Sequence, residues 1–158
     1  MGAIEERLRE LEVQLPAPLA ARDQGFNYVL VNVAGSIAYL AGHGPQDGGQ
    51  PTPLMTGRIG DDLSAEEGYR AARLVGLAML ASLKQELGEL DRVSRWLRAV
   101  GYINAAHDFT GHALVLNGFS DLIVEIWGDA GYHTRAAPGA ATLPFNVPVI
   151  VEATVQLG

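Results

Sequence analysis

One arginine, Arg135, stands in a stretch of small residues near the end of the chain. The residues that follow it, up to position 142, are Ala, Pro, Gly and Thr. A guanidinium binds a carboxylate through two parallel hydrogen bonds, and small neighbours leave room for such a ligand. Arg135 is therefore a candidate for binding the carboxylate of a small molecule. An arginine that pairs with an acidic neighbour, or that lies with its stem over a strand edge, is the alternative interpretation.

Glu152 is the second candidate, because it is the only ionisable residue in the last predicted strand, Val149 to Leu157. The alternation of apolar with other residues predicts this strand, with Glu152 on the same face as Ile150. Glu152 is a candidate acid–base group. As an alternative, it pairs with Arg135 and holds the arginine in place until a ligand arrives.

Other catalytic chemistries find little support in the sequence. The chain has no cysteine, which excludes thiolate zinc sites and cysteine nucleophiles. His107 and His112 are five residues apart, a spacing that does not place two histidines and a carboxylate together on one helix face. Nucleophile elbows and glycine-rich phosphate loops are also missing from the sequence. We therefore expect no metal and no cofactor.

The elements that must position these candidates follow from the apolar pattern. A helix over residues 3–13 ends at two prolines, and a hairpin is expected from 26–33 and 36–41. Ser64 and Glu67 form a capping box that begins a long helix ending at Gly88. A second amphipathic helix follows residues 107–110 and ends at Gly128. Residues 42–53 are expected to be a surface loop.

The segment Val93 to Ile103 is predicted to be a strand with apolar residues on both faces. Simple alternation places Val93, Leu97 and Ile103 on one face, and Trp96, Val100 and Tyr102 on the other. Two long helices are too few to cover both faces of a sheet. The second face is therefore expected to pack against other subunits.

The charge of the chain argues against nucleic-acid binding. The net charge is −7, and the chain contains a single lysine, Lys84. Proteins that bind nucleic acids draw most of their affinity from Lys and Arg against phosphate. No apolar run approaches the roughly 20 residues needed to cross a bilayer, and the charged N-terminal segment is not typical of a signal peptide. A cytoplasmic location without membrane association is expected.

The C-terminal stretch resembles that of the RidA (YjgF/YER057c/UK114) family. The similarity lies in Arg135, the Leu143-Pro144 turn and the glutamate-bearing strand after it, and in the segment N-G-F-S-D-L-I-V-E-I-W-G before them. It extends from about Asn27 to the end and is greatest with the longer branch labelled endoribonuclease L-PSP. The length of the chain predicts a single RidA-like domain over residues 1–158, with residues 1–18 as an N-terminal helical extension.

The fold implied by this resemblance is the α+β, chorismate mutase-like fold. Two long helices then lie on one face of a mixed sheet, and three subunits press their sheets together into a barrel. The ligand clefts of such a homotrimer lie between adjacent subunits, with an arginine at the floor of each.

The resemblance also implies a set of site residues. Arg135 corresponds to the carboxylate-binding arginine, and the backbone amides of Ala136 and Ala137 orient the ligand. Tyr28, Asn117 and His43 fall on positions near the family's cleft. Each also has a plainer interpretation, as an edge-strand aromatic, a helix-surface polar residue and a solvated loop histidine respectively.

Two positions depart from the family pattern. The family's water-positioning glutamate falls on Ile150, and Glu152 lies two residues further along the strand, displaced by roughly 6 to 7 Å. The cysteine that follows the arginine in the family is Ala137 here. The mechanism therefore does not transfer residue by residue.

Three hypotheses for the function remain. The first is hydrolysis of reactive enamines or imines, of the 2-aminoacrylate type, to keto acids and ammonia. The second is a non-catalytic trimer that binds a small carboxylate-bearing metabolite. The third is the endoribonuclease activity that the branch label implies, and the acidic charge disfavours it.

Overall fold

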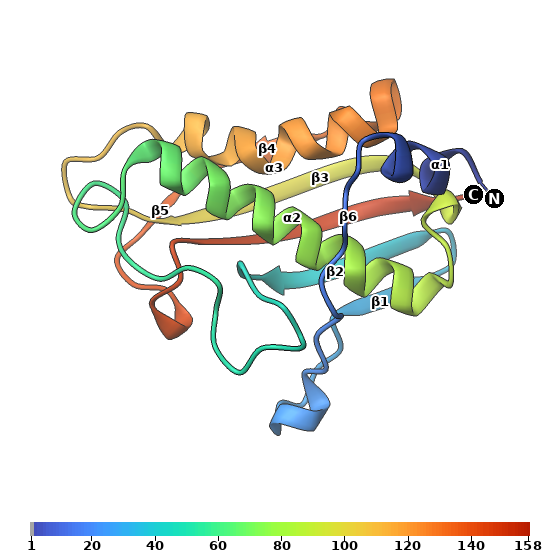
Figure 1. Cartoon of the computed structure of the whole chain (residues 1–158), viewed down its shortest axis with the longest axis horizontal. Helices are drawn as coiled ribbons and strands as arrows, with labels where there is room; N and C mark the ends of the chain where they lie inside the picture. Colours follow the sequence, from blue (N-terminus) through green and yellow to red (C-terminus); the bar gives the residue numbers. More distant parts are fainter. Residues whose placement is uncertain (1) are drawn as a thin grey trace.

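The computed structural model describes residues 2–158 as an α+β fold, as the sequence predicted (Figure 1). Met1, the first residue of the predicted extension, lies outside the described residues. The helices and strands are α1 (Ala3–Glu10), η1 (Arg22–Gln24), β1 (Val31–Ala34), β2 (Ile37–His43), α2 (Ala65–Leu87), η2 (Leu90–Arg92), β3 (Val93–Asn104), α3 (His112–Trp127), η3 (Gly128–Gly131), β4 (Thr134–Ala136), β5 (Gly139–Ala140), η4 (Pro144–Asn146) and β6 (Val149–Leu157).

The strands form one mixed sheet in the order β1-β2-β6-β3-β4, with β5 also paired to β3. The pairs β1–β2, β2–β6 and β3–β6 are antiparallel, whereas β4 and β5 run parallel to β3. Figure 1 shows α2 and α3 lying along the sheet, with α3 next to β3 and β4. Along β6 the odd-numbered residues are buried and the even-numbered ones are half-buried or exposed, so the helices cover one face and leave the other open.

Local sequence signals account for the long helices. The Ser64 hydroxyl accepts a hydrogen bond from the Glu67 amide, and the Glu67 carboxylate accepts one from the Ser64 amide, which confirms the predicted capping box. Gly88 ends α2 with a φ of 84°, a conformation that glycine adopts without strain. The helix α1 begins at the Asp91 carboxylate, which accepts hydrogen bonds from the amides of Ile4 and Glu5.

Two predictions about the strands were wrong. Residues 26–30 lie before β1 and not in a strand, so Tyr28 stands in a loop. His43 does not lie in a surface loop: it is the last residue of β2, and its side chain is completely buried.

The predicted faces of β3 were also wrong. The pairing of β3 with β6 shifts register between Val93 and Arg95 and again between Trp96 and Arg98. Each irregularity changes the alternation of side chains, so Val93, Trp96 and Ile103 all lie on the helix-covered face. The open face of β3 therefore carries Arg95 and Arg98 besides apolar residues.

The open face of β3 is therefore less apolar than the sequence indicated, and the homotrimer stays a prediction. Exposed side chains on the open face still include Tyr39, which is 52% exposed and pairs with Thr154 of β6. No helix formed by residues 2–158 has both the length and the hydropathy needed to cross a membrane.

Candidate functional site

Arg135 lies in β4, at the edge of the sheet, and its side chain points toward α3. The parallel pairing of β4 with β3 places Arg135 beside Ala99. The guanidinium donates hydrogen bonds to Ser120 Oγ at 3.0 Å and to the Ala113 carbonyl at 3.1 Å. Both acceptors are in α3, so the helix and the edge strand together hold the arginine.

A cavity of about 530 Å³ surrounds this guanidinium. We call it the Arg135 cleft, and its lining residues are Asn117, Ser120, Asp121, Val124, Glu125, Tyr132, His133 and Arg135. Asp121 and Glu125 are held by α2, since they accept hydrogen bonds from the Tyr69 hydroxyl at 2.8 Å and from Arg73 at 3.1 Å.

Arg135 is half-buried without an anionic partner. Among the ion pairs formed by the described part of the chain, none includes Arg135. A guanidinium has five N–H donors, and the protein engages two of them, so three remain for a ligand or for water. A cation partly withdrawn from water and lacking a counter-charge is an anion-binding site by its chemistry.

A hydrogen-bonded chain extends from Arg135 into the protein. Ser120 Oγ lies 3.0 Å from His133 Nε2, and His133 Nδ1 lies 2.7 Å from the Gly131 carbonyl oxygen. A carbonyl only accepts, so Nδ1 carries the proton and Nε2 accepts the hydrogen bond that the Ser120 hydroxyl donates. Arg135 in turn donates to Ser120 Oγ, so the hydrogen-bonded chain runs from Arg135 through Ser120 and His133 to the Gly131 carbonyl.

Glu152 lies on the other face of the sheet. Ala99 pairs with Arg135 on one side and with Ala153 on the other, so those three residues share the helix-covered face. Glu152, the neighbour of Ala153, therefore points to the open face. The ion pair between Arg135 and Glu152, which the sequence left open, does not form within this chain.

Glu152 lines a different cavity, of about 500 Å³, on the open face. We call it the open-face cleft, and its lining residues include Tyr28, Asn32, Tyr39, Arg98, Val100 and Glu152. Tyr28 is 47% exposed, and its ring is 6.1 Å from that of Phe26. The sheet therefore separates the candidates into two groups, with Arg135 and Asn117 in one and Tyr28 and Glu152 in the other.

Ile150, which the family resemblance aligns with a glutamate, lines a smaller cavity together with Tyr28, Gly42 and Phe145. A Cβ atom added to Gly42 would lie 2.9 Å from Ile150 Cγ2, so this part of the wall is closely packed. Of the backbone candidates, Ala136 is exposed in β4 and Ala137, just after it, is half-buried.

His43 points into the core and not into either cleft. His43 Nδ1 lies 2.7 Å from the Ala41 carbonyl oxygen, and Nε2 lies 2.9 Å from Ser82 Oγ in α2. Burial lowers the pKa of His43 to about 4, although the hydrogen bond to Ala41 opposes this effect. His43 is therefore neutral at physiological pH and joins β2 to α2.

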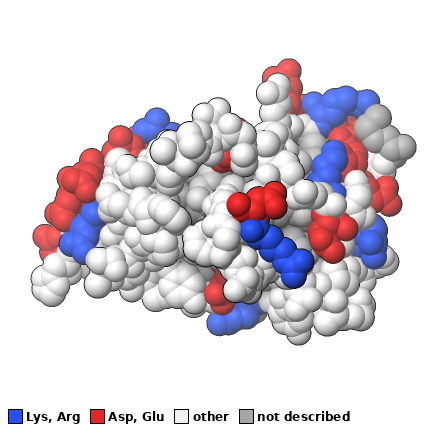
Figure 2. All heavy atoms as spheres, turned by 90° about the horizontal axis from the view of Figure 1, so that it is seen from below, with Lys and Arg blue, Asp and Glu red and all other residues white. Residues whose placement is uncertain are grey.

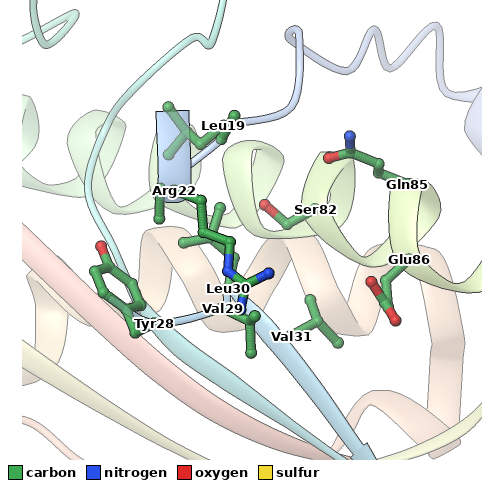
Figure 3. A pocket seen from close by; sticks show the side chains of 11 residues that line it. Leu19, Arg22, Tyr28, Val29, Leu30, Val31, Ser82, Gln85 and Glu86 are labelled. Atoms are coloured by element: carbon green, nitrogen blue, oxygen red, sulfur yellow. The ribbon is translucent and has the colours of Figure 1, made fainter. Parts of the chain in front are cut away.

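Ser82 lines a further cavity, of about 270 Å³, between α2 and residues 19–31 (Figure 3). Figure 3 shows Arg22, Tyr28 and Glu86 around it. Ser82 is only 3% exposed, so its hydroxyl offers little surface to a ligand. In the described residues, no three His, Asp or Glu side chains gather in a way that could hold a metal ion.

The sequence reasoning missed Ser120 and His133. Their spacing to recognised candidates was a usable signal, because Ser120 follows Asn117 by three residues on a helix and His133 precedes Arg135 by two in an extended segment. These spacings place Ser120 on the same helix face as Asn117, and His133 on the same side of the chain as Arg135.

Binding of an anion at Arg135 is expected to depend on pH through His133. Burial lowers the pKa of His133 and Arg135 lowers it further, while the bond to the Gly131 carbonyl raises it. An anion on Arg135 cancels part of the positive charge and so raises the pKa of His133. The other charged groups that line the cleft are Asp121 and Glu125, both from α3.

The pKa of His133 is higher in the anion-bound protein than in the free protein. Between these two pKa values, anion binding is therefore accompanied by the uptake of a proton on His133. Affinity is therefore greatest below the pKa of the free protein and falls as the pH rises through this window. Calorimetric titration with pyruvate at several values between about pH 4 and 8 measures the effect. A pH-independent affinity, or the same dependence in His133→Gln, contradicts this assignment.

Comparisons with known proteins match nearly the whole chain. The family model described as "YjgF/chorismate mutase-like, putative endoribonuclease" matches residues 5–157. Protein TCP17 from Trypanosoma cruzi is 36% identical over 159 residues, covering 99% of this chain and 95% of that protein.

Solved structures agree with this match. A structure titled as a putative endoribonuclease from Shewanella oneidensis is 34% identical, with a TM-score of 0.90 over 99% of this chain and 100% of that one. The structure of E. coli TdcF with bound serine is 20% identical, with a TM-score of 0.62 over 90% and 94% of the two chains, and shares the fold.

Proposed function

Since the chain belongs to the YjgF/chorismate mutase-like, putative endoribonuclease family, we propose that it binds a small carboxylate-bearing metabolite and hydrolyses a reactive enamine or imine. The products are a keto acid and ammonia. The observation that carries the proposal is Arg135, half-buried beside a cavity, with three N–H donors unused by the described residues.

The carboxylate of the substrate lies against the guanidinium in this proposal. Two parallel hydrogen bonds fix its plane, and the adjacent C=N or C=C–N group is then oriented toward Ser120 and Asn117. The bound serine of TdcF, which has this fold, is an amino acid with a carboxylate of the required size. Enamines and imines of amino acids keep that carboxylate next to the reacting carbon.

A second copy of the chain completes the site in this proposal. Tyr28 and Glu152 cannot reach Arg135 within one chain, because the sheet lies between them. Arg135 stands in an edge strand, where a neighbouring subunit can present its open face. A closed ring of three copies forms three equivalent sites of this kind, each joining the Arg135 cleft of one copy to Tyr28 of the next.

Mixing two variants tests this arrangement. Arg135→Ala and Tyr28→Ala are each expected to lose imine hydrolysis, and mixed trimers are expected to recover it. With equal random mixing, roughly a quarter of the sites pair an intact Arg135 with an intact Tyr28. Light scattering should give three times the mass of one chain. The absence of recovery in mixtures that exchange subunits contradicts a shared site.

The proposal as a whole is tested on the wild-type protein. Calorimetry with pyruvate measures carboxylate binding. The hydrolysis is measured as the rate of disappearance of 2-aminoacrylate, generated in the assay, above its spontaneous rate. Binding without acceleration supports the non-catalytic alternative, a trimer that senses a metabolite. Neither binding nor acceleration contradicts the proposal.

The endoribonuclease activity in the names of the relatives is not favoured here. On the face drawn in Figure 2, the basic side chains lie beside carboxylates and not in a separate stripe. A net charge of −7 disfavours binding to a polyanion. Arg135 by itself supplies the single positive contact that a small carboxylate needs.

A further inference from the structure

We propose that Ser120 and His133 are the proton-transfer pair of the Arg135 cleft. Ser120 Oγ contacts the substrate or its attacking water, and His133 Nε2 takes and returns the proton through Ser120. This inference rests on the proposed function, because it assigns the acid–base step of the same reaction. Ser120 is therefore a catalytic residue, and His133 acts through it as a positioning and proton-accepting residue.

The hydrogen-bond directions in the cleft support this role. His133 Nδ1 donates to the Gly131 carbonyl at 2.7 Å, which orients Nε2 toward Ser120 Oγ, 3.0 Å away. The Ser120 hydroxyl proton therefore points at a base. Of the two lone pairs on Ser120 Oγ, one accepts the hydrogen bond from Arg135 and the other is left for a ligand.

A second histidine–serine pair in the same chain, His43 and Ser82, has a purely structural role. His43 also bonds through Nδ1 to the carbonyl two residues earlier, and through Nε2 to a serine, Ser82. That pair is buried, with His43 at 0% and Ser82 at 3% exposure. The Ser120–His133 pair differs because both side chains line a cavity and the serine also contacts an arginine.

Within one chain, the open face of the sheet supplies no acid–base group to the Arg135 cleft. Ile150 stands where the family has its glutamate, and Glu152 faces the open side of the sheet. Asp121 and Glu125, the carboxylates of the Arg135 cleft, are bound to Tyr69 and Arg73 of α2. The Ser120–His133 pair, by contrast, is in direct hydrogen-bond contact with Arg135.

The enamine 2-aminoacrylate first takes a proton from solvent at its methylene carbon, which gives the iminium. Water then attacks the iminium carbon, a C–O bond forms, and the π electrons move to nitrogen. The water proton passes to Ser120 Oγ while the Ser120 proton passes to His133 Nε2, which gives a neutral carbinolamine and an imidazolium. The pair then returns the proton to the amine nitrogen. The C–N bond breaks, a C=O bond forms, and the hydroxyl proton leaves with ammonia as ammonium.

The test compares two variants with one matched control. Ser120→Ala and His133→Gln are expected to lower the rate of 2-aminoacrylate hydrolysis at least about 100-fold, the usual size of a general acid–base effect, with pyruvate affinity within about 3-fold of wild type. Ser82→Ala, which removes the buried serine, is expected to keep the wild-type rate. Thermal unfolding confirms that each variant is folded.

The pH profile separates proton transfer from a structural role. In the wild type, kcat/KM is expected to rise with pH as His133 loses its proton, and this acid limb is expected to disappear in His133→Gln. Full activity in both Ser120→Ala and His133→Gln overturns the inference and leaves the proposed function standing. If Glu152→Gln loses activity while Ser120→Ala keeps full activity, the inference is overturned, and the proton-transfer step belongs to Glu152 of a neighbouring copy. A wild type that binds pyruvate without hydrolysing 2-aminoacrylate overturns both.

Discussion

Replacing Arg135 by alanine is expected to weaken the binding of pyruvate by about 100-fold. Charge-assisted hydrogen bonds contribute about 1.5 to 3 kcal/mol each, and a carboxylate on the guanidinium gains up to two of them. A loss of about 3 kcal/mol corresponds to roughly two orders of magnitude in affinity. Isothermal titration calorimetry at low ionic strength measures this change directly.

Two variants make the Arg135 result interpretable. Arg95→Ala removes the same charge from the open face of β3 and is expected to leave pyruvate affinity within about 2-fold, because surface charges act weakly at a distance. Arg135→Lys keeps the charge and loses the two-pronged contact, so an intermediate loss of about 10-fold is expected. Undiminished binding by Arg135→Ala defeats the assignment of the cleft.

Replacing Gly118 by alanine is expected to destabilise the fold by about 3 kcal/mol, the upper range for forcing atoms into a packed interior. A Cβ atom at Gly118 in α3 would overlap the carbonyl oxygen of Tyr69 in α2. The overlapping atoms belong to backbone, so the helices must move apart. This loss exceeds the gain of about 1 kcal/mol that alanine brings to a helix interior.

Thermal unfolding measures this effect, with an expected fall in Tm of roughly 6 to 12 °C for a chain of this size. Gly76→Ala in α2 is the matched control, because its added Cβ would meet the end of the Leu122 side chain, 2.7 Å away, which can rotate. We expect a clearly smaller fall there. Gly118 lies between Asn117 and Ser120, so the shift of α3 should also weaken pyruvate binding. An unchanged Tm in Gly118→Ala contradicts the close approach of α2 and α3.

Local sequence patterns determined most of the elements. The capping box at Ser64 and the glycine at position 88 correctly bounded α2, and the apolar spacing predicted α3. The alternation from Val149 to Leu157 correctly predicted β6, with one face buried. These signals depend on residues within one or two turns or one strand, where backbone geometry fixes which side chains share a face.

The position of Arg135 near Asn117 also followed from the sequence, but through the family resemblance and not through local pattern. Both residues line the same cleft in the structure. Their roles in binding stay predictions that the variants above test.

Only the tertiary structure decided how the elements face one another. The two irregularities in β3 depend on its pairing with β6, so simple alternation assigned Trp96 to the wrong face. Arg135 and Glu152 are on opposite sides of the sheet because of the register between β4, β3 and β6. The contact between Ser120 and His133 likewise depends on the path of the chain after α3. Strand register and helix packing depend on contacts between segments that are far apart in the sequence. The local pattern of one strand or helix therefore does not specify which segment it pairs with.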